Sequence, residues 1–301
     1  MPEKQGISAF LKAEELHKLG RLVLLSRYVV EGNLAGAHRS PNKGASSEFA
    51  DHRAYMEGDD PKHIDWKVFG RTDRYYVKRF EDETNLRVYL IIDNSNSMHY
   101  GSDTTTKFQY ACHLAAALGY VVVKMRDSIG LYLFSDKIEA KVNAANSFNH
   151  LNNLLIQLQE HKPGKETKIA ESLHMIAESV RKRALIVIIS DLFDEPSEIN
   201  LALSHFRKMH HDVIVCHTLD PMEMDLSFRR GCEFMDMETG ETISADPRSL
   251  ARDYQKIFQE FLEKYRSSCR AMNIDYRIAR TDTHLEDFVR AYLEERRRLS
   301  K

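Results

Sequence analysis

The apolar run Val88–Ile92, which ends at Asp93, constrains the fold of this chain more than any other stretch. A run that does not alternate between polar and apolar residues is typical of a central strand in a parallel sheet, because helices cover both faces of such a strand. The stretch Leu185–Ser190 has the same character and ends at Asp191. Helical patterns alternate with these and other strand patterns, which predicts an α/β fold with a doubly wound, mostly parallel sheet flanked by helices.

Side chains with hard oxygen atoms follow the first of these strands at alternate positions, namely Asp93, Ser95 and Ser97. In an extended chain alternate residues project to the same side, and open α/β sheets bind ligands beyond the carboxyl ends of their strands. Mg²⁺ takes oxygen ligands in octahedral geometry, so one carboxylate and two hydroxyls form only part of a site. The plainer alternative is a helix start, in which a serine or aspartate caps backbone N–H groups.

Two later stretches could complete such a site. Residues 164–167 form the polar turn Gly-Lys-Glu-Thr, which precedes a helical pattern that begins at Ile169. The second apolar strand ends at Asp191. Because the carboxyl ends of parallel strands meet at one edge of a sheet, we expect these stretches to lie beside the Asp-x-Ser-x-Ser loop.

This order of motifs resembles the metal-ion-dependent adhesion site (MIDAS) of von Willebrand factor A-like domains. The resemblance implies that one divalent cation, Mg²⁺ or in its place Mn²⁺ or Ca²⁺, is held by Asp93, Ser95, Ser97, Thr167 and Asp191. Capping explains a lone Asp-x-Ser-x-Ser motif, but it does not explain three motifs in this order.

A second resemblance rests on Gly-Asp-Asp at 58–60 and Ile-Asp-Trp at 64–66, a fixed distance before the metal loop. These strings resemble the MoxR-associated von Willebrand factor A-like family, also called domain-of-unknown-function family 58, from about Leu22 to the C-terminus. The resemblance implies a MoxR-type AAA+ ATPase as partner. It also implies an adaptor role in the chaperone-like maturation of an unidentified client protein.

The same segment contains a cluster of charges that includes Asp59, Asp60, Asp65 and Lys78. Ion pairs that hold the segment together are one interpretation. A second metal site is the other, because metal-dependent nucleases combine carboxylates with a cation that stabilises phosphoryl charge. The apolar side chains within positions 64–69 predict a buried anchor for this segment. They include Trp66, the only tryptophan of the sequence.

The predicted organisation is an N-terminal helix and β segment over 1–84, packed on an α/β domain over 85–301 with a small hairpin insertion near 226–246. A net charge of −2 gives no reason to expect nucleic acid as a partner. The four cysteines form no C-x-x-C pair, so neither zinc nor a disulfide framework is expected. The N-terminus lacks the apolar core of a signal peptide and no stretch is long enough for a membrane span, so we expect a cytoplasmic protein.

Only two of the five implied ligands carry charge, so the ion would keep positive character and an open position. A carboxylate of a partner protein, or Glu166 of this chain, would suit that position. We therefore expect a non-enzymatic interaction module. The alternative is a metal-dependent phosphohydrolase or nuclease, with His99, Glu166 or Asp194 as general base. A degenerate fold that binds no metal is the plainest possibility.

Overall fold

The computed structural model describes residues 6–16, 18–19, 47–56, 64–82, 86–161, 168–226, 232–235, 242–245, 247–287 and 289–290. The chain divides into two units, residues 34–85 and residues 1–33 together with 86–301, which we call the 34–85 module and the α/β domain. This division differs from the predicted segment 1–84, because the start of the chain groups with the α/β domain. Leu11 and Leu19 are buried in the core of that domain, and helix α1 (Ile7–Phe10) contacts its helix α4.

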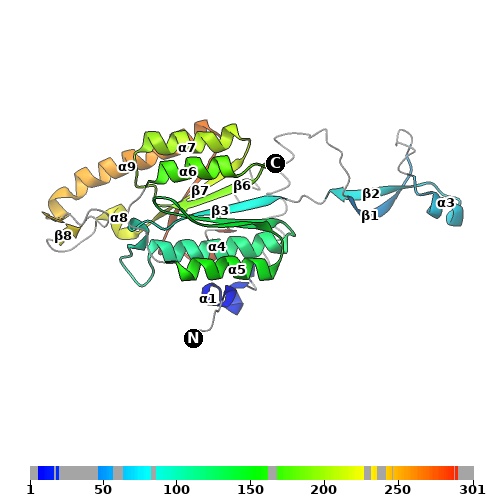
Figure 1. The fold of residues 1–301 in the computed structure, drawn as a ribbon, viewed down its shortest axis with the longest axis horizontal. Coiled ribbons are helices and arrows are strands. Elements are labelled where there is room, and N and C mark those ends of the chain that lie inside the picture. The colour runs from blue at the N-terminus through cyan, green and yellow to red at the C-terminus, as the bar shows by residue number, and fades with distance from the viewer. Residues whose placement is uncertain are drawn as a thin grey trace. The chain divides into compact units, whose positions relative to one another are not determined.

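The α/β domain is built on a six-stranded sheet with the strand order β10-β7-β6-β3-β4-β5 (Figure 1). The strands are β3 (Arg87–Asp93), β4 (Ser128–Phe134), β5 (Ile138–Ala145), β6 (Leu185–Ser190), β7 (Asp212–Leu219) and β10 (Asp275–Arg280). All neighbours are parallel except β4 and β5, which form an antiparallel hairpin at one edge of the sheet. The predicted mostly parallel α/β sheet is therefore confirmed.

Helices cover both faces of this sheet (Figure 1). Helices α4 (Lys107–Lys124) and α5 (Phe148–Glu160) pack on one face. Helices α6 (Ile169–Ser179), α7 (Pro196–Lys208) and α9 (Pro247–Ala271) pack on the other. Leu90 and Ile92 pack in the core on the α4 and α5 face, whereas Ile91 packs in the core on the α6, α7 and α9 face. Burial on both faces explains why the sequence of β3 does not alternate.

Three smaller elements follow the strands. A 3₁₀ turn, η2 (Ser97–His99), comes after β3, and helix α8 (Pro221–Asp225) comes after β7. Strands β8 (Cys232–Met235) and β9 (Thr242–Ala245) pair antiparallel within the region where we expected a hairpin insertion. Among the described helices, none has both the length and the apolar composition required to cross a membrane.

The 34–85 module contains an antiparallel pair, β1 (Ser47–Ala54) and β2 (Tyr76–Asp82), and helix α3 (Trp66–Thr72). Asp65 caps this helix by accepting hydrogen bonds from the backbone N–H of Lys67 at 2.9 Å and of Val68 at 3.2 Å. The prediction of a buried anchor at Trp66 was wrong, since its side chain is 61% exposed. Two strands and a two-turn helix bury too little surface to enclose an indole ring. Asp59 and Asp60 lie outside the described residues.

Candidate metal centre

The parallel pairing of β3 and β6 positions the candidate site. Ile92 of β3 lies opposite Ile189 of β6, so Asp93 and Ser190 end their strands at the same level. The chain reaches β4 on one side of β3 and β6 on the other, which makes the carboxyl edge between β3 and β6 the point where strand order reverses. Open α/β sheets bind their ligands at such a point.

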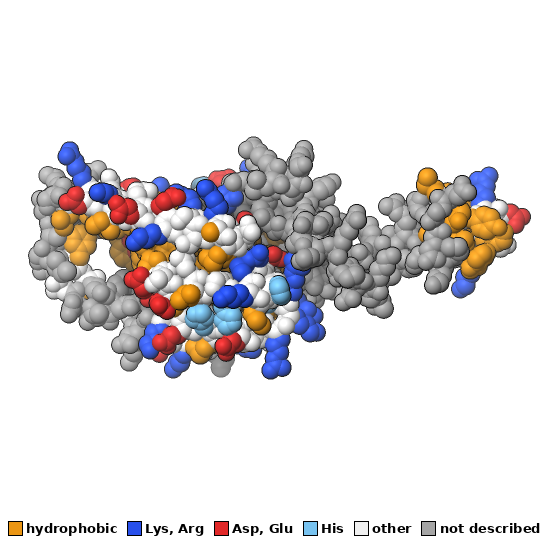
Figure 2. Space-filling view, turned by 90° about the horizontal axis from the view of Figure 1, so that it is seen from above, with side chains coloured by type: hydrophobic (Ala, Val, Ile, Leu, Met, Phe, Trp, Pro, Cys, Tyr) orange, Lys and Arg blue, Asp and Glu red, His pale blue; other side chains and the backbone are white. Residues whose placement is uncertain are grey.

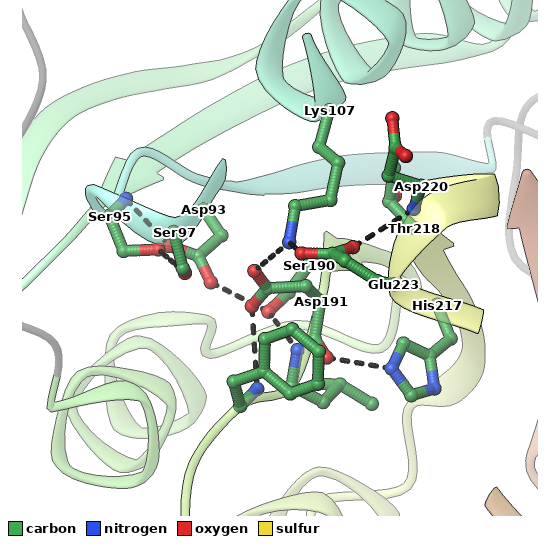
Figure 3. Close-up of polar contacts among 12 residues, drawn as sticks. Asp93, Ser95, Ser97, Lys107, Ser190, Asp191, His217, Thr218, Asp220 and Glu223 are labelled. Carbon is green, nitrogen blue, oxygen red and sulfur yellow. Dashed lines mark hydrogen bonds and ion pairs between the residues drawn. The ribbon is translucent and has the colours of Figure 1, made fainter. Parts of the chain in front are cut away.

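The carboxylate of Asp93 is fully buried and fixed by hydrogen bonds on both oxygens. Its Oδ1 accepts from the backbone N–H of Ser95 at 2.9 Å, and its Oδ2 accepts from Oγ of Ser190 at 2.6 Å. The hydroxyls of Ser95 and Ser97 lie 3.0 Å apart. Figure 3 shows Asp93, Ser95 and Ser97 together, with Asp191 facing them. The alternate spacing in the sequence therefore brings all three side chains to one place.

Asp191 is also fully buried, and its two oxygens have unequal partners. Oδ2 accepts a charge-assisted hydrogen bond from Nζ of Lys107 at 2.7 Å. Oδ1 accepts only a long hydrogen bond, of 3.3 Å, from the backbone N–H of Phe193. The backbone carbonyl of Asp191 is bonded at 2.6 Å to Nε2 of the buried His217, which fixes the turn after β6. One carboxylate oxygen thus remains open to a further ligand.

Lys107 is the only cation that contacts these carboxylates among the described residues. Its Nζ donates to Glu223 Oε1 at 2.6 Å as well as to Asp191. Glu223 belongs to the capping box of α8, in which Oε2 accepts from the backbone N–H of Asp220 at 3.0 Å. In Figure 3 Lys107 and Glu223 lie on the side of Asp191 away from the serines. A buried ammonium therefore links the strand β6 edge to α8.

The pKa shifts reflect this burial. Burial, together with the nearby charge of Asp191, raises the pKa of Asp93 to about 7. Burial by itself would lower the pKa of Lys107, but Asp191 and Glu223 outweigh it and raise that pKa, so the ammonium stays charged. Burial lowers the pKa of His217 to about 4, so this imidazole is neutral near pH 7. Asp93 is left as a buried carboxylate with hydrogen-bond donors but no cationic partner among the described residues.

The donor set fits a hard divalent cation. Asp93, Asp191 and Glu223 carry more negative charge than Lys107 neutralises, and the serine hydroxyls and Asp191 Oδ1 are oxygen ligands of the type that Mg²⁺ takes. No three His, Cys, Asp or Glu side chains form a metal-binding group in the described part of the chain. An ion here would therefore depend on hydroxyl oxygens as well as on carboxylates.

Comparison with known proteins places the chain in a family. The model of the family described as "Protein of unknown function DUF58" matches residues 51–264. The chain belongs to this family. Two relatives, uncharacterized protein Mb1516 of Mycobacterium bovis and uncharacterized protein Rv1480 of Mycobacterium tuberculosis, are each 25% identical over 285 residues, which covers 93% of this chain and 89% of theirs.

Among solved structures, an aerotolerance-related membrane protein from Bacteroides fragilis is similar to this DUF58 chain. It is 16% identical, matches 71% of this chain and 99% of its own, and superposes with a TM-score of 0.47. The conserved hypothetical protein BatB from Bacteroides thetaiotaomicron is 15% identical, matches 70% of this chain and 96% of its own, and gives a TM-score of 0.44.

Four of the five predicted ligands of this DUF58 chain, Asp93, Ser95, Ser97 and Asp191, lie at one edge of the sheet. Thr167 lies outside the described residues, as does Glu166. Whether these residues hold a metal stays a prediction.

The other two candidate bases have local partners. His99 is bonded through Nε2 to Asn94 Oδ1 at 3.0 Å and stacks on Phe108. A carboxylate oxygen of Asp194 accepts from the backbone N–H of Glu195 at 2.7 Å.

Sequence reasoning missed Lys107, Glu223 and Ser190. For Lys107 a signal was present, because a lysine as the first residue of an apolar helix lies at the end where the macrodipole disfavours a cation. Such a residue needs a carboxylate nearby to be stable when it is buried. The pattern Asp220-Pro-x-Glu223 is a recognisable capping box, but it predicts only a helix start. Neither signal identifies the residues of the other elements that complete the contact.

Proposed function

We propose that this DUF58 protein is a metal-dependent protein–protein interaction module. In this proposal Asp93, Ser95, Ser97, Thr167 and Asp191 hold Mg²⁺ in the manner of the MIDAS of von Willebrand factor A-like domains. The observation that carries the proposal is the convergence of one carboxylate and two hydroxyls at the end of β3, beside Asp191, which directly follows β6. A divalent cation there would neutralise Asp93, which is buried and has no counter-charge among the described residues.

The chemistry of the site favours binding over catalysis. Hydrolytic metal sites need a general base within hydrogen-bond reach of the attacking water. The described candidates, His99 and Asp194, already hydrogen-bond to Asn94 and to backbone N–H groups. Lys107 is fully buried and engaged by two carboxylates, so its ammonium does not face a substrate. An ion with two charged ligands and an open position instead suits a carboxylate of a partner protein.

The proposed partner is a MoxR-type AAA+ ATPase in the cytoplasm, and the proposed role is that of an adaptor in the chaperone-like maturation of a client protein. This part of the proposal rests on the resemblance of the sequence to MoxR-associated proteins. The alternative, a phosphohydrolase or nuclease that uses the acidic cluster of the 34–85 module, has less support. Asp65, its only described carboxylate, is occupied in capping α3.

The test is a pulldown of a purified MoxR-type AAA+ ATPase, with Mg²⁺ or with EDTA. Asp93→Ala and Asp191→Ala should fold, by circular dichroism, and lose the Mg²⁺-dependent binding. Asp136→Ala is the matched control, because Asp136 is an exposed carboxylate in the turn between β4 and β5 and should leave binding unchanged. Binding that survives EDTA, or that survives both aspartate substitutions, would refute the proposal. Metal-dependent turnover of phosphoesters that Asp93→Ala abolishes would favour the enzyme instead.

A further inference from the structure

Two histidines from different helices meet on the outside of the α/β domain. His174 of α6 and His205 of α7 have their Nδ1 atoms 3.1 Å apart, and their ring centroids are 5.4 Å apart. Both residues are half-buried, so each is in part exposed to solvent. Figure 2 shows that histidine side chains are among those at the surface of the domain on the face that it views. This pair could not be predicted from the sequence, because strand β6 separates the two residues along the chain.

The helices hold the pair in place. Leu173, which precedes His174, and Phe206, which follows His205, are fully buried in the core beneath the two helices. Helices α6 and α7 also contact each other along their length. The rotation of each helix about its axis is therefore fixed by packing, and so is the position from which each histidine side chain projects. A site on two packed helices is better preorganised than a site on loops.

The separation of the two nitrogens matches that of two ligands on one metal ion. With Zn–N bonds of about 2.1 Å, nitrogens 3.1 Å apart subtend about 95–100° at the ion. This angle lies between the octahedral and the tetrahedral values. We propose that the Nδ1 atoms of His174 and His205 form a surface site for Zn²⁺ or a similar borderline transition-metal ion. Imidazole suits such ions, whereas Mg²⁺ takes oxygen ligands.

Binding requires a shift of tautomer and a rotation of the rings, because lone pairs that face each other along the hydrogen bond must both turn toward the ion. Without metal, Nδ1–H of one ring donates to the lone pair of the other Nδ1. When the ion binds, that hydrogen moves to Nε2 of the donating ring, and both Nδ1 lone pairs point at the metal. No third His, Cys, Asp or Glu joins the pair within the described residues. Water fills the remaining positions, which leaves the site open to a donor from another molecule. This inference is independent of the proposed oxygen site at Asp93.

The experiment is a Zn²⁺ titration of the tag-free full chain, followed by competition with a chromophoric chelator. The wild-type protein should bind one Zn²⁺ that a large excess of Mg²⁺ does not displace. His174→Ala and His205→Ala should each weaken this binding at least tenfold. His284→Ala is the matched control, because His284 is an exposed histidine of the same domain, and it should leave the affinity unchanged. Asp93→Ala should also keep the Zn²⁺ site, which separates it from the proposed Mg²⁺ site.

Circular dichroism establishes that each variant is folded, and His174→Asn with His205→Asn replaces any alanine variant that is not. A Cu²⁺ electron paramagnetic resonance spectrum gives a second readout, since coordinated imidazole nitrogens split its lines. Equal Zn²⁺ affinity in the wild type and in the variant with both His174→Ala and His205→Ala would overturn the inference. A Cu²⁺ spectrum without nitrogen splitting from this pair would overturn it as well.

Discussion

Replacing Lys107 with methionine should remove much of the stability of the α/β domain. The side chain is fully buried, and its ammonium forms ion pairs of 2.7 Å with Asp191 and 2.6 Å with Glu223. Methionine fills a similar volume but leaves both carboxylates without a counter-charge. Breaking a buried ion pair by removing one partner costs roughly 3–5 kcal/mol, because the remaining charge is uncompensated. Two carboxylates share this lysine, so we expect the loss to lie in the upper part of that range.

The measurement is the free energy of unfolding from urea titration at pH 7 in the presence of EDTA. Lys182→Met is the control, because Lys182 is exposed, and a surface change of this kind stays within about 0.5 kcal/mol. The triple variant Lys107→Met, Asp191→Asn, Glu223→Gln should recover part of the loss, since it removes the unpaired charges. If Lys107→Met costs no more than Lys182→Met, the buried ion pairs do not have the role that we assign to them.

Three further predictions concern other parts of the chain. Because the pKa of Asp93 is raised from 3.8 to about 7, its protonated form stabilises the fold at pH 4 and this contribution is lost as the pH rises to 7. In EDTA, the free energy of unfolding of Asp93→Asn relative to the wild type should therefore rise by roughly 3 kcal/mol over that interval, measured by urea unfolding at each pH. Asp65→Ala should cost α3 about 1 kcal/mol through loss of its cap, which hydrogen exchange of the α3 amides would measure. Leu90→Ala, in the fully buried centre of β3, should cost about 2–5 kcal/mol in unfolding free energy.

The sequence was sufficient to predict the central sheet and the meeting of two of its polar loops, those at Asp93 and Asp191, while the third predicted loop, at Thr167, lies outside the described residues. Both follow from the spacing of apolar residues along each strand and from the direction of the strands. An apolar run such as Val88–Ile92 must be covered on both faces, and the carboxyl ends of parallel strands lie at one edge of the sheet. Asp93 and Asp191 were thereby assigned to one place although they are far apart in the sequence. Ser190, which precedes Asp191 and hydrogen-bonds to Asp93, is 97 positions from it. These inferences need only local patterns and one topological rule.

The contacts that set the electrostatics could not be predicted in this way. Lys107, Glu223 and His217 come from three elements, and their meeting depends on the exact rotation of α4 and on the turn into α8. Trp66 was misplaced for a different reason. Hydrophobicity predicts burial only where enough surrounding structure exists to cover a side chain, and the described part of the 34–85 module is too small for that.

The charge balance links stability to the proposed function. A site in which Lys107 neutralised every carboxylate would be stable without a ligand and would have no affinity for a cation. Here one ammonium pairs with Asp191 and Glu223, while Asp93 keeps only hydrogen-bond donors. If a cation binds as proposed, the cost of that unpaired carboxylate would be recovered, and ion affinity and fold stability would change together. Mg²⁺ should therefore stabilise the wild type against urea far more than it stabilises Asp93→Asn, and equal stabilisation of the two would separate the ion from this site.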